Sequence, residues 1–114
     1  MNDAQEWGRL ALDLCRDGVD PHEAERAARI TMTYRRRERD PERRHWGPGD
    51  ALPDPPPAAG TDLDGARWEH QVAGHGMYRM SAKDRRKHRR SSGDFEGVRP
   101  WFYLLDSEGP ITEA

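Results

Sequence analysis

The sequence is poor in cysteine and in apolar residues, and both shortages restrict what the protein can be. Cys15 is the only cysteine among 114 residues, so an internal disulfide and a thiolate zinc cluster are excluded within one chain. Hydrophobic residues make up 33% of the chain and charged residues 35%. A chain this polar closes only a small core, because little apolar area is available to offset the entropy of ordering.

Long hydrophobic runs and a leader segment are also lacking. The longest apolar run is Trp101 to Leu105, far shorter than the roughly 20 residues that a membrane-spanning helix needs. The first six residues are acidic and do not have the basic start and apolar stretch of a signal peptide. We therefore expect one small domain, located in the cytoplasm, with no membrane partner.

Motifs that name a reaction are absent from the sequence. There is no glycine-rich phosphate loop followed by lysine, and the serines do not lie in a nucleophile elbow. The spacing of His70, His75 and His88 matches no metal-site signature. Cys15 lies on the apolar side of a predicted helix, which indicates a small core residue and not a reactive thiolate. We therefore expect no enzymatic activity, no metal and no cofactor.

The sequence does contain two segments in which positively charged residues are concentrated. Residues 35–44 include six arginines and three acids, for a net charge of +3, and residues 83–90 include six cations and only Asp84, for +5. Since the whole chain carries −2, the remaining residues carry −10. Two cationic patches on an acidic body create local fields that attract phosphate or an acidic protein.

The first 40 residues predict an antiparallel helical hairpin. Apolar residues from Trp7 to Cys15 recur at helical spacing, which predicts a helix over 6–16, and Gly18 suits its C-cap. Asp20 and Pro21 are typical of a helix start, so a second helix should run from Pro21 to about Arg39. Its alanines allow close approach of the first helix.

Residues 41–65 predict a proline-rich linker or a long surface loop. Six of the nine prolines lie in this stretch, and the run from Pro55 to Pro57 favours an extended polyproline conformation. The stretch has few apolar anchors, of which Trp46 and Leu52 are the candidates.

Residues 66–106 predict a small antiparallel β part that carries a short basic helix. Alternation around Trp68 indicates one strand, residues 74–76 a turn, and residues 77–80 the returning strand. A weak cap at Ser81 precedes a helix over 82–90. Residues 98–105 predict a further strand, with Pro100 at an edge or at its start, and residues 107–114 a loose acidic tail. The expected fold class is α+β.

The leading functional hypothesis is a small non-enzymatic binding protein that engages DNA or RNA electrostatically. Guanidinium groups bind phosphate oxygens, and release of counterions from a nucleic acid drives association. Each basic segment also has an explanation that needs no ligand. Residues 83–90 would then form a solvated face of the protein. Residues 35–44 would form a helix end whose cations complement the helix dipole and pair with nearby acids. The candidate nucleic-acid-binding residues are Lys83, Arg85, Arg86, Lys87, Arg89, Arg90, Arg36 and Arg37.

The alternative hypothesis is a protein-interaction module, such as an adaptor, inhibitor or assembly subunit, that uses the hairpin and the acidic surface. A nucleoprotein target would satisfy both hypotheses. The arginine-, aspartate- and proline-rich composition suggests an accessory protein of a GC-rich bacterium or its phage. The clustered aromatic residues either form the core or stack on bases; they are Trp68, Tyr78, Trp101, Phe102 and Tyr103.

Overall fold

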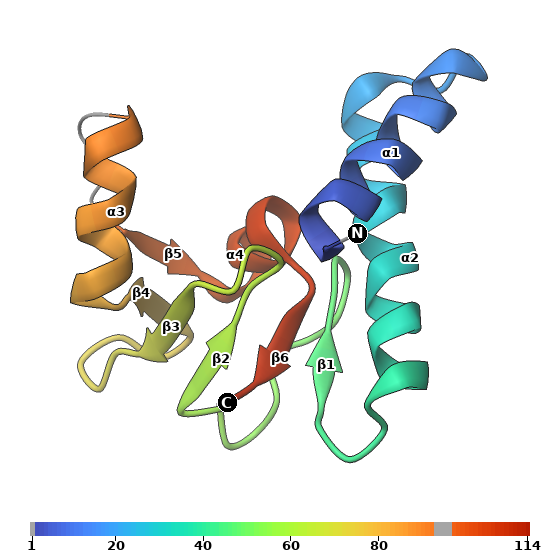
Figure 1. Ribbon diagram of the computed structural model, residues 1–114. Coiled ribbons are helices and arrows are strands. Elements are labelled where there is room, and N and C mark those ends of the chain that lie inside the picture. The colour runs from blue at the N-terminus through green and yellow to red at the C-terminus, as the bar shows by residue number, and fades with distance from the viewer. Residues whose placement is uncertain (1, 93–96) are drawn as a thin grey trace.

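The computed structural model describes residues 2–92 and 97–114, with the backbone alone for residues 88–92. It confirms the α+β class: two N-terminal helices in contact precede a curled six-stranded antiparallel sheet and a short C-terminal helix (Figure 1). The elements are α1 (Asp3–Arg16), α2 (Pro21–Arg39), β1 (His45–Trp46), β2 (Ala59–Thr61), β3 (Arg67–His70), β4 (Met77–Met80), α3 (Ala82–Ser92), β5 (Val98–Pro100), α4 (Trp101–Glu108) and β6 (Ile111–Glu113). Within the described ranges, no helix combines the length and the hydropathy that crossing a bilayer requires.

The predicted helical hairpin is present, and its helices begin at side-chain caps. Asn2 and Gln5 exchange side-chain and backbone hydrogen bonds as a capping box, so α1 begins three residues before the predicted start. Oδ1 of Asp20 accepts hydrogen bonds from the backbone N–H groups of His22 and Glu23, which starts α2 at the predicted residue. Local chemistry alone therefore accounts for both helix starts.

Small side chains bring the two helices of the hairpin together. Ala24 and Ala28 of α2 are fully buried, and Ala11 of α1 is buried. Cys15 is only half-buried, at the margin of the apolar stripe. Burial of these small groups stabilises the hairpin, but it leaves few large apolar side chains to attach α2 to the sheet.

The sheet has the strand order β1-β6-β2-β3-β4-β5, and every neighbouring pair is antiparallel. The last residues, expected to form a loose tail, instead form β6 between β1 and β2. Thr112 of β6 pairs with His45 on one side and with Thr61 on the other. A strand of three residues carries no alternation pattern, so only its partners across the sheet define it.

The stretch from residue 41 to residue 65, expected as a linker or long loop, contributes β1 and β2 to the sheet. Trp46 of β1 is buried in the core and Leu52 packs against the core from the loop, as expected for the two candidate anchors. Prolines fill the connection between the two strands. This stretch is therefore an integral part of the domain.

The expectation of one strand over 98–105 is wrong beyond Pro100. β5 ends at Pro100, and α4 begins at Trp101. Trp101, Leu104 and Leu105 are buried at the i, i+3 and i+4 spacing of a helix, whereas Phe102 is exposed. Pro100 has no N–H to continue a strand ladder and suits the start of a helix. The core that α4 completes contains Trp46, Ala66, Trp68, Tyr78, Met80, Trp101, Leu104, Leu105 and Ile111.

Candidate functional site

The arginines of segment 35–44 contact the protein's own carboxylates. Each of the six forms an ion pair, and in five of the six pairs the acid lies outside this segment, in α1, in the loop after β1, or in β6. The pairs are Arg35–Glu6, Arg36–Asp3, Arg37–Asp50, Arg39–Asp3, Arg43–Asp40 and Arg44–Glu113. Intramolecular acids therefore offset much of the positive charge that the sequence concentrates at the end of α2.

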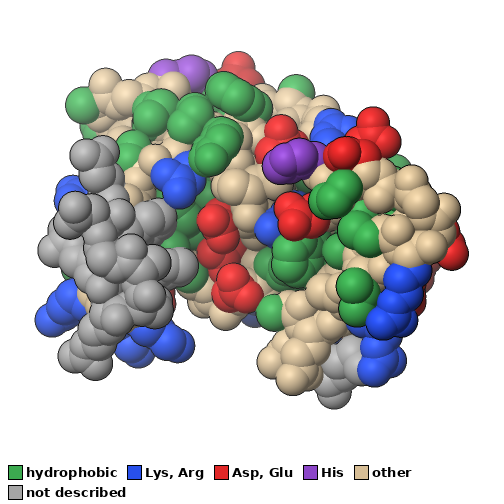
Figure 2. Space-filling view, turned by 90° about the horizontal axis from the view of Figure 1, so that it is seen from above, with side chains coloured by type: hydrophobic (Ala, Val, Ile, Leu, Met, Phe, Trp, Pro, Cys, Tyr) green, Lys and Arg blue, Asp and Glu red, His purple; other side chains and the backbone are tan. Residues whose placement is uncertain are grey.

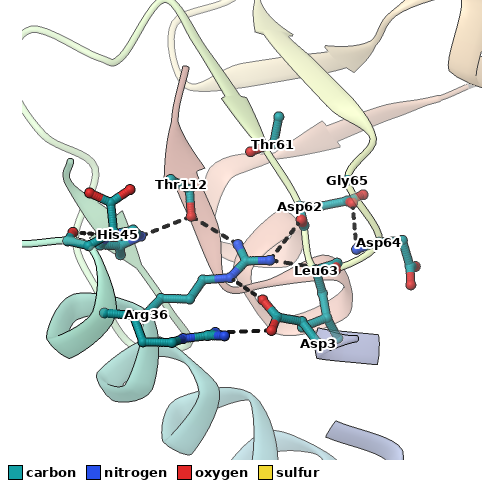
Figure 3. Close-up of a pocket in the computed structure, with 11 residues that line it drawn as sticks. Asp3, Arg36, His45, Thr61, Asp62, Leu63, Asp64, Gly65 and Thr112 are labelled. Atoms are coloured by element: carbon teal, nitrogen blue, oxygen red, sulfur yellow. Dashed lines mark hydrogen bonds and ion pairs between the residues drawn. The ribbon is translucent and has the colours of Figure 1, made fainter. Parts of the chain in front are cut away.

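Arg36 is the most extensively bonded of these arginines (Figure 3). Its side chain is 13% exposed, and Nε donates to Oδ2 of Asp3 at 2.9 Å. Nη1 donates to the hydroxyl of Thr112 at 2.9 Å and to the carbonyl of Pro110 at 3.2 Å. Nη2 donates to the carbonyl of Asp62 at 3.3 Å. One guanidinium thus joins α1, α2, β6 and the turn after β2.

Arg37, the other candidate ligand of nucleic acid in α2, also has partners inside the protein. Its Nη2 donates to the carbonyl of His45 at 2.9 Å and to Oδ2 of Asp50 at 3.0 Å. Its guanidinium also lies over the ring of Tyr34, at 5.5 Å from the centroid. The geometry of Arg36 and Arg37 is that of side chains that hold the fold together.

A cavity of about 500 Å³ opens beside Arg36, between the ends of the hairpin helices and the β6–β2 part of the sheet (Figure 3). Nine of its eleven lining residues have polar or charged side chains, whereas small-molecule pockets are lined mainly by hydrophobic and aromatic side chains. The lining groups that matter for its chemistry are Asp3, Arg36, Arg39, His45, Asp62 and Thr112.

His45 in this cavity has both ring nitrogens engaged. Nε2 lies 2.7 Å from the carbonyl oxygen of Asp40, which can only accept, so the hydrogen-bond network assigns the ring proton to Nε2. Nδ1 then accepts from the hydroxyl of Thr112 at 2.9 Å, and the same hydroxyl accepts from Arg36. A buried histidine with this bonding is a structural group, since neither nitrogen is left for proton transfer or metal binding.

Asp62 is buried at the turn between β2 and β3. Oδ1 accepts from the backbone N–H groups of Asp64 and Ala66, and Oδ2 accepts from Nε1 of Trp68 at 2.9 Å. Burial raises the pKa of this carboxyl, and the hydrogen bonds from Trp68 and Ala66 offset only part of that effect. The carboxylate builds the turn and connects it to the core. The sequence Asp62-Leu63-Asp64-Gly65 is itself a turn signal that sequence analysis could have used.

A second acidic group lies close to Asp62, at the end of α4. Burial raises the pKa of Glu108 to about 7, and the charge of Asp62 adds to the effect while Arg29 opposes it. Arg29 donates to the carbonyl of Gly109 at 2.8 Å and lies over the ring of Trp7 at 4.4 Å from the centroid. Figure 2 shows acidic side chains gathered in a hollow near the centre of the face seen from above. Among the described residues, no three His, Cys, Asp or Glu side chains are arranged to hold a metal ion.

The basic helix α3 lies at the opposite end of the sheet from β1 and α2 (Figure 1). The structure therefore does not join the two basic segments into one patch. Ser81 begins α3: its hydroxyl donates to Oδ2 of Asp84 at 2.6 Å and accepts the N–H of Asp84. Burial would raise the pKa of Asp84, but hydrogen bonds from Ser81 and Arg67 and the charges of neighbouring lysines outweigh it and lower the pKa.

The cations of α3 that the structure describes differ in exposure. Lys83, Arg86 and Lys87 are exposed, and Arg85 is half-buried. Nε of Arg86 donates to the carbonyl of Ala82 at 3.4 Å, so this side chain runs back along the helix. The backbone of the candidate residues Arg89 and Arg90 continues α3, and their side chains lie outside the described part of the chain.

The aromatic residues divide between the core and the surface. Trp68, Tyr78 and Trp101 are buried, whereas Phe102 and Tyr103 are 70% and 48% exposed on α4. The guanidinium of Arg99 lies over the ring of Tyr103, 5.1 Å from its centroid. Three of the five aromatic residues therefore belong to the core, and the other two lie at the surface.

The chain was also compared with known protein families, curated proteins and solved structures. No family model, no curated protein and no solved structure matches the chain.

Proposed function

We propose that this protein is a small non-enzymatic nucleic-acid-binding protein, and that α3 is the element that contacts the phosphate backbone. The observation that carries the proposal is the exposure of Lys83, Arg86 and Lys87 on a helix whose residues 82–92 sum to +5. The arginines of segment 35–44 pair with acids of the same chain. The proposal therefore assigns Arg36 and Arg37 to the fold and the phosphate contacts to α3.

The arrangement of α3 suits an electrostatic contact. Lys83 and Lys87 are four residues apart and share one side of the helix, while Arg86 lies on a neighbouring side. The only acid in the helix, Asp84, is turned toward Ser81 and the backbone of Arg67 at the first turn. Exposed lysines and arginines on such a rod displace counterions from a nucleic acid, which supplies a favourable free energy that depends on salt.

The alternative function, a protein-interaction module built on the hairpin, has less support from the geometry. Three apolar side chains of the hairpin, those of Ala24, Ala28 and Met32, are fully buried and therefore not available to a partner. Exposed large side chains on the hairpin are scattered, as Leu12 and Tyr34 lie on different helices. We treat a protein partner as an outcome of the experiment below.

The test compares two charge-matched variants by fluorescence anisotropy with labelled DNA and RNA oligonucleotides. The α3 variant carries Lys83→Gln, Arg86→Gln and Lys87→Gln; glutamine keeps a helix propensity close to that of lysine and arginine. The control variant carries Arg9→Gln, Arg16→Gln and Arg43→Gln, three exposed residues of α1 and the α2–β1 turn. Both variants lose three positive charges, so a difference between their affinities cannot come from net charge alone.

We expect the α3 variant to weaken binding at least about 10-fold and to reduce the slope of log K against log salt by about 2 to 3, because three phosphate contacts are lost. The control variant should bind like the wild type. Absence of binding to DNA and RNA at about 20 mM salt would refute the proposal, since electrostatic association is strongest there. Equal losses in both variants would also refute it. The alternative would be favoured if the protein purified from its host carries no nucleic acid, and if a partner protein stays bound in stoichiometric amount after nuclease treatment.

A further inference from the structure

Two adjacent aromatic side chains face solvent on α4, although the opposite side of this helix fills the core. Phe102 is 70% exposed and Tyr103 48% exposed, whereas Trp101, Leu104 and Leu105 are buried. Exposure of two large aromatic rings is costly in water and is typical of surfaces that bind a ligand. In a chain with only 8% aromatic residues, this use of two of them calls for an explanation.

The charged groups around the two rings favour a negatively charged ligand with flat faces. The guanidinium of Arg99 lies over one face of the Tyr103 ring, so a cation and an aromatic ring are stacked at this surface. Asp106, one turn after Phe102, lies 3.8 Å from Nε of Arg26, so its negative charge is partly offset. Nucleic-acid bases stack on aromatic rings while arginines contact the adjoining phosphates.

The position of β5 connects this aromatic surface to α3. The backbone N–H of Met80, two residues before α3, donates to the carbonyl of Gly97 at 2.8 Å, and Arg99 pairs with Tyr78 across β4 and β5. Figure 1 shows β5 running from beside α3 toward α4. The three residues of β5 therefore extend from beside the start of α3 to the start of α4, so one short ligand can contact both helices.

We propose that the nucleic acid bound by this protein is single-stranded, and that Phe102 and Tyr103 stack on its bases while α3 contacts its phosphates. This inference rests on the proposed function and adds the class of ligand. The bases of a duplex are paired and stacked on one another, so their faces are not accessible to protein rings. A single strand presents base faces to the rings and phosphates to the cations together.

The first test measures binding of a single strand of about 12 nucleotides and of the duplex of the same sequence. The variant carries Phe102→Ala and Tyr103→Ala, and because both rings are exposed and alanine favours helix, α4 should persist. The matched control is Tyr34→Ala, an exposed tyrosine of α2 that also has an arginine over its ring. Thermal melting checks that all three proteins are folded.

We expect the wild type to bind the single strand more tightly than the duplex, and the α4 variant to lose about 10-fold to 100-fold for the single strand. The salt dependence should not change, because no charge is removed. Tyr34→Ala should bind like the wild type. Wild-type binding that is equal for both ligands, or equal losses in the α4 and Tyr34 variants, would overturn the inference.

The second test removes the bases and keeps the phosphates. On a single strand with abasic positions, the wild type should lose as much affinity as the α4 variant loses on the intact strand, and the two proteins should bind the abasic strand equally. Binding that depends on α3 but not on Phe102 and Tyr103 would overturn the stacking inference and leave the proposed function standing. Absence of any binding by the wild type would refute the proposed function itself.

Discussion

Nε of Arg36 donates to Oδ2 of Asp3 at 2.9 Å, and this contact joins the last turn of α2 to the first turn of α1. The same guanidinium donates to Thr112 and Pro110 on the β6 side. Arg29, two helical turns earlier on the same face of α2, donates to the carbonyl of Gly109. Arginines thus attach the hairpin to the sheet, where a larger protein would use apolar side chains.

Replacement of Arg36 by methionine should lower the free energy of unfolding by about 2 to 4 kcal/mol, because Asp3 and several carbonyl groups lose a largely buried partner. Urea denaturation measures the change. The control is Arg43→Met: its ion pair with Asp40 is exposed at 3.6 Å, and its loss should cost less than about 0.5 kcal/mol. Similar costs for the two variants would contradict the structural role of Arg36.

Asp62→Asn should destabilise the protein by about 1 to 3 kcal/mol, because an amide cannot reproduce all the bonds of the carboxylate. If the amide oxygen accepts from Asp64 and Ala66, the NH₂ group faces Nε1 of Trp68, and two donors then oppose each other. Urea denaturation followed by tryptophan fluorescence gives the cost. Asp64→Asn, at an exposed neighbour, should change stability by less than about 0.5 kcal/mol; a comparable loss there would argue against a specific bond to Trp68.

Stability should fall as the pH rises toward 7, because of Glu108. Its pKa is raised from 4.5 to about 7 in the folded protein by burial and by Asp62, so the folded state holds a proton that the unfolded chain has released. The favourable contribution is complete below about pH 4.5 and is lost as the pH rises through the folded pKa. For this partly exposed group the loss is on the order of 1 to 2 kcal/mol after solvent screening.

Glu108→Gln should remove that contribution to the pH dependence. The variant should be more stable than the wild type at pH 8 and equal to it near pH 4.5, as measured by urea denaturation at each pH. Glu38→Gln, at an exposed position of α2, is the control and should follow the wild-type curve. Parallel curves for the wild type and Glu108→Gln would show that Glu108 titrates normally.

Gly60→Ala should destabilise the protein, because β6 lies directly against this position of β2. A Cβ at Gly60 would lie 2.6 Å from Cγ2 of Ile111 and 3.1 Å from the carbonyl oxygen of Thr112. Relief of this overlap shifts β6, at about 1 to 3 kcal/mol. Gly8→Ala in α1 meets nothing within 4 Å and should stabilise the helix by about 0.5 to 1 kcal/mol. Thermal melting of both variants measures the difference, and an unchanged Gly60→Ala would contradict the position of β6.

The sequence by itself determined the elements whose signals are local. Asp20 and Pro21 define the start of α2, the alternation around Trp68 defines β3, and Ser81 defines the start of α3. It also located the charge: residues 83–90 form a basic helix that remains the basis of the proposed function. A cap or a periodic pattern involves residues within about four positions of each other, so sequence analysis can detect it.

Only the tertiary structure decided the elements that depend on distant partners. The run from Trp101 to Leu105 suits a strand or a helix, and packing of Trp101 and Leu104 against the sheet selects the helix. β6 exists because β1 and β2 flank it. Arg36 differs from its neighbours because Pro110 and Thr112, 74 and 76 residues away, lie within hydrogen-bond distance. Contacts across such separations leave no pattern in one sequence, because they depend on how the elements pack and not on which residues are adjacent.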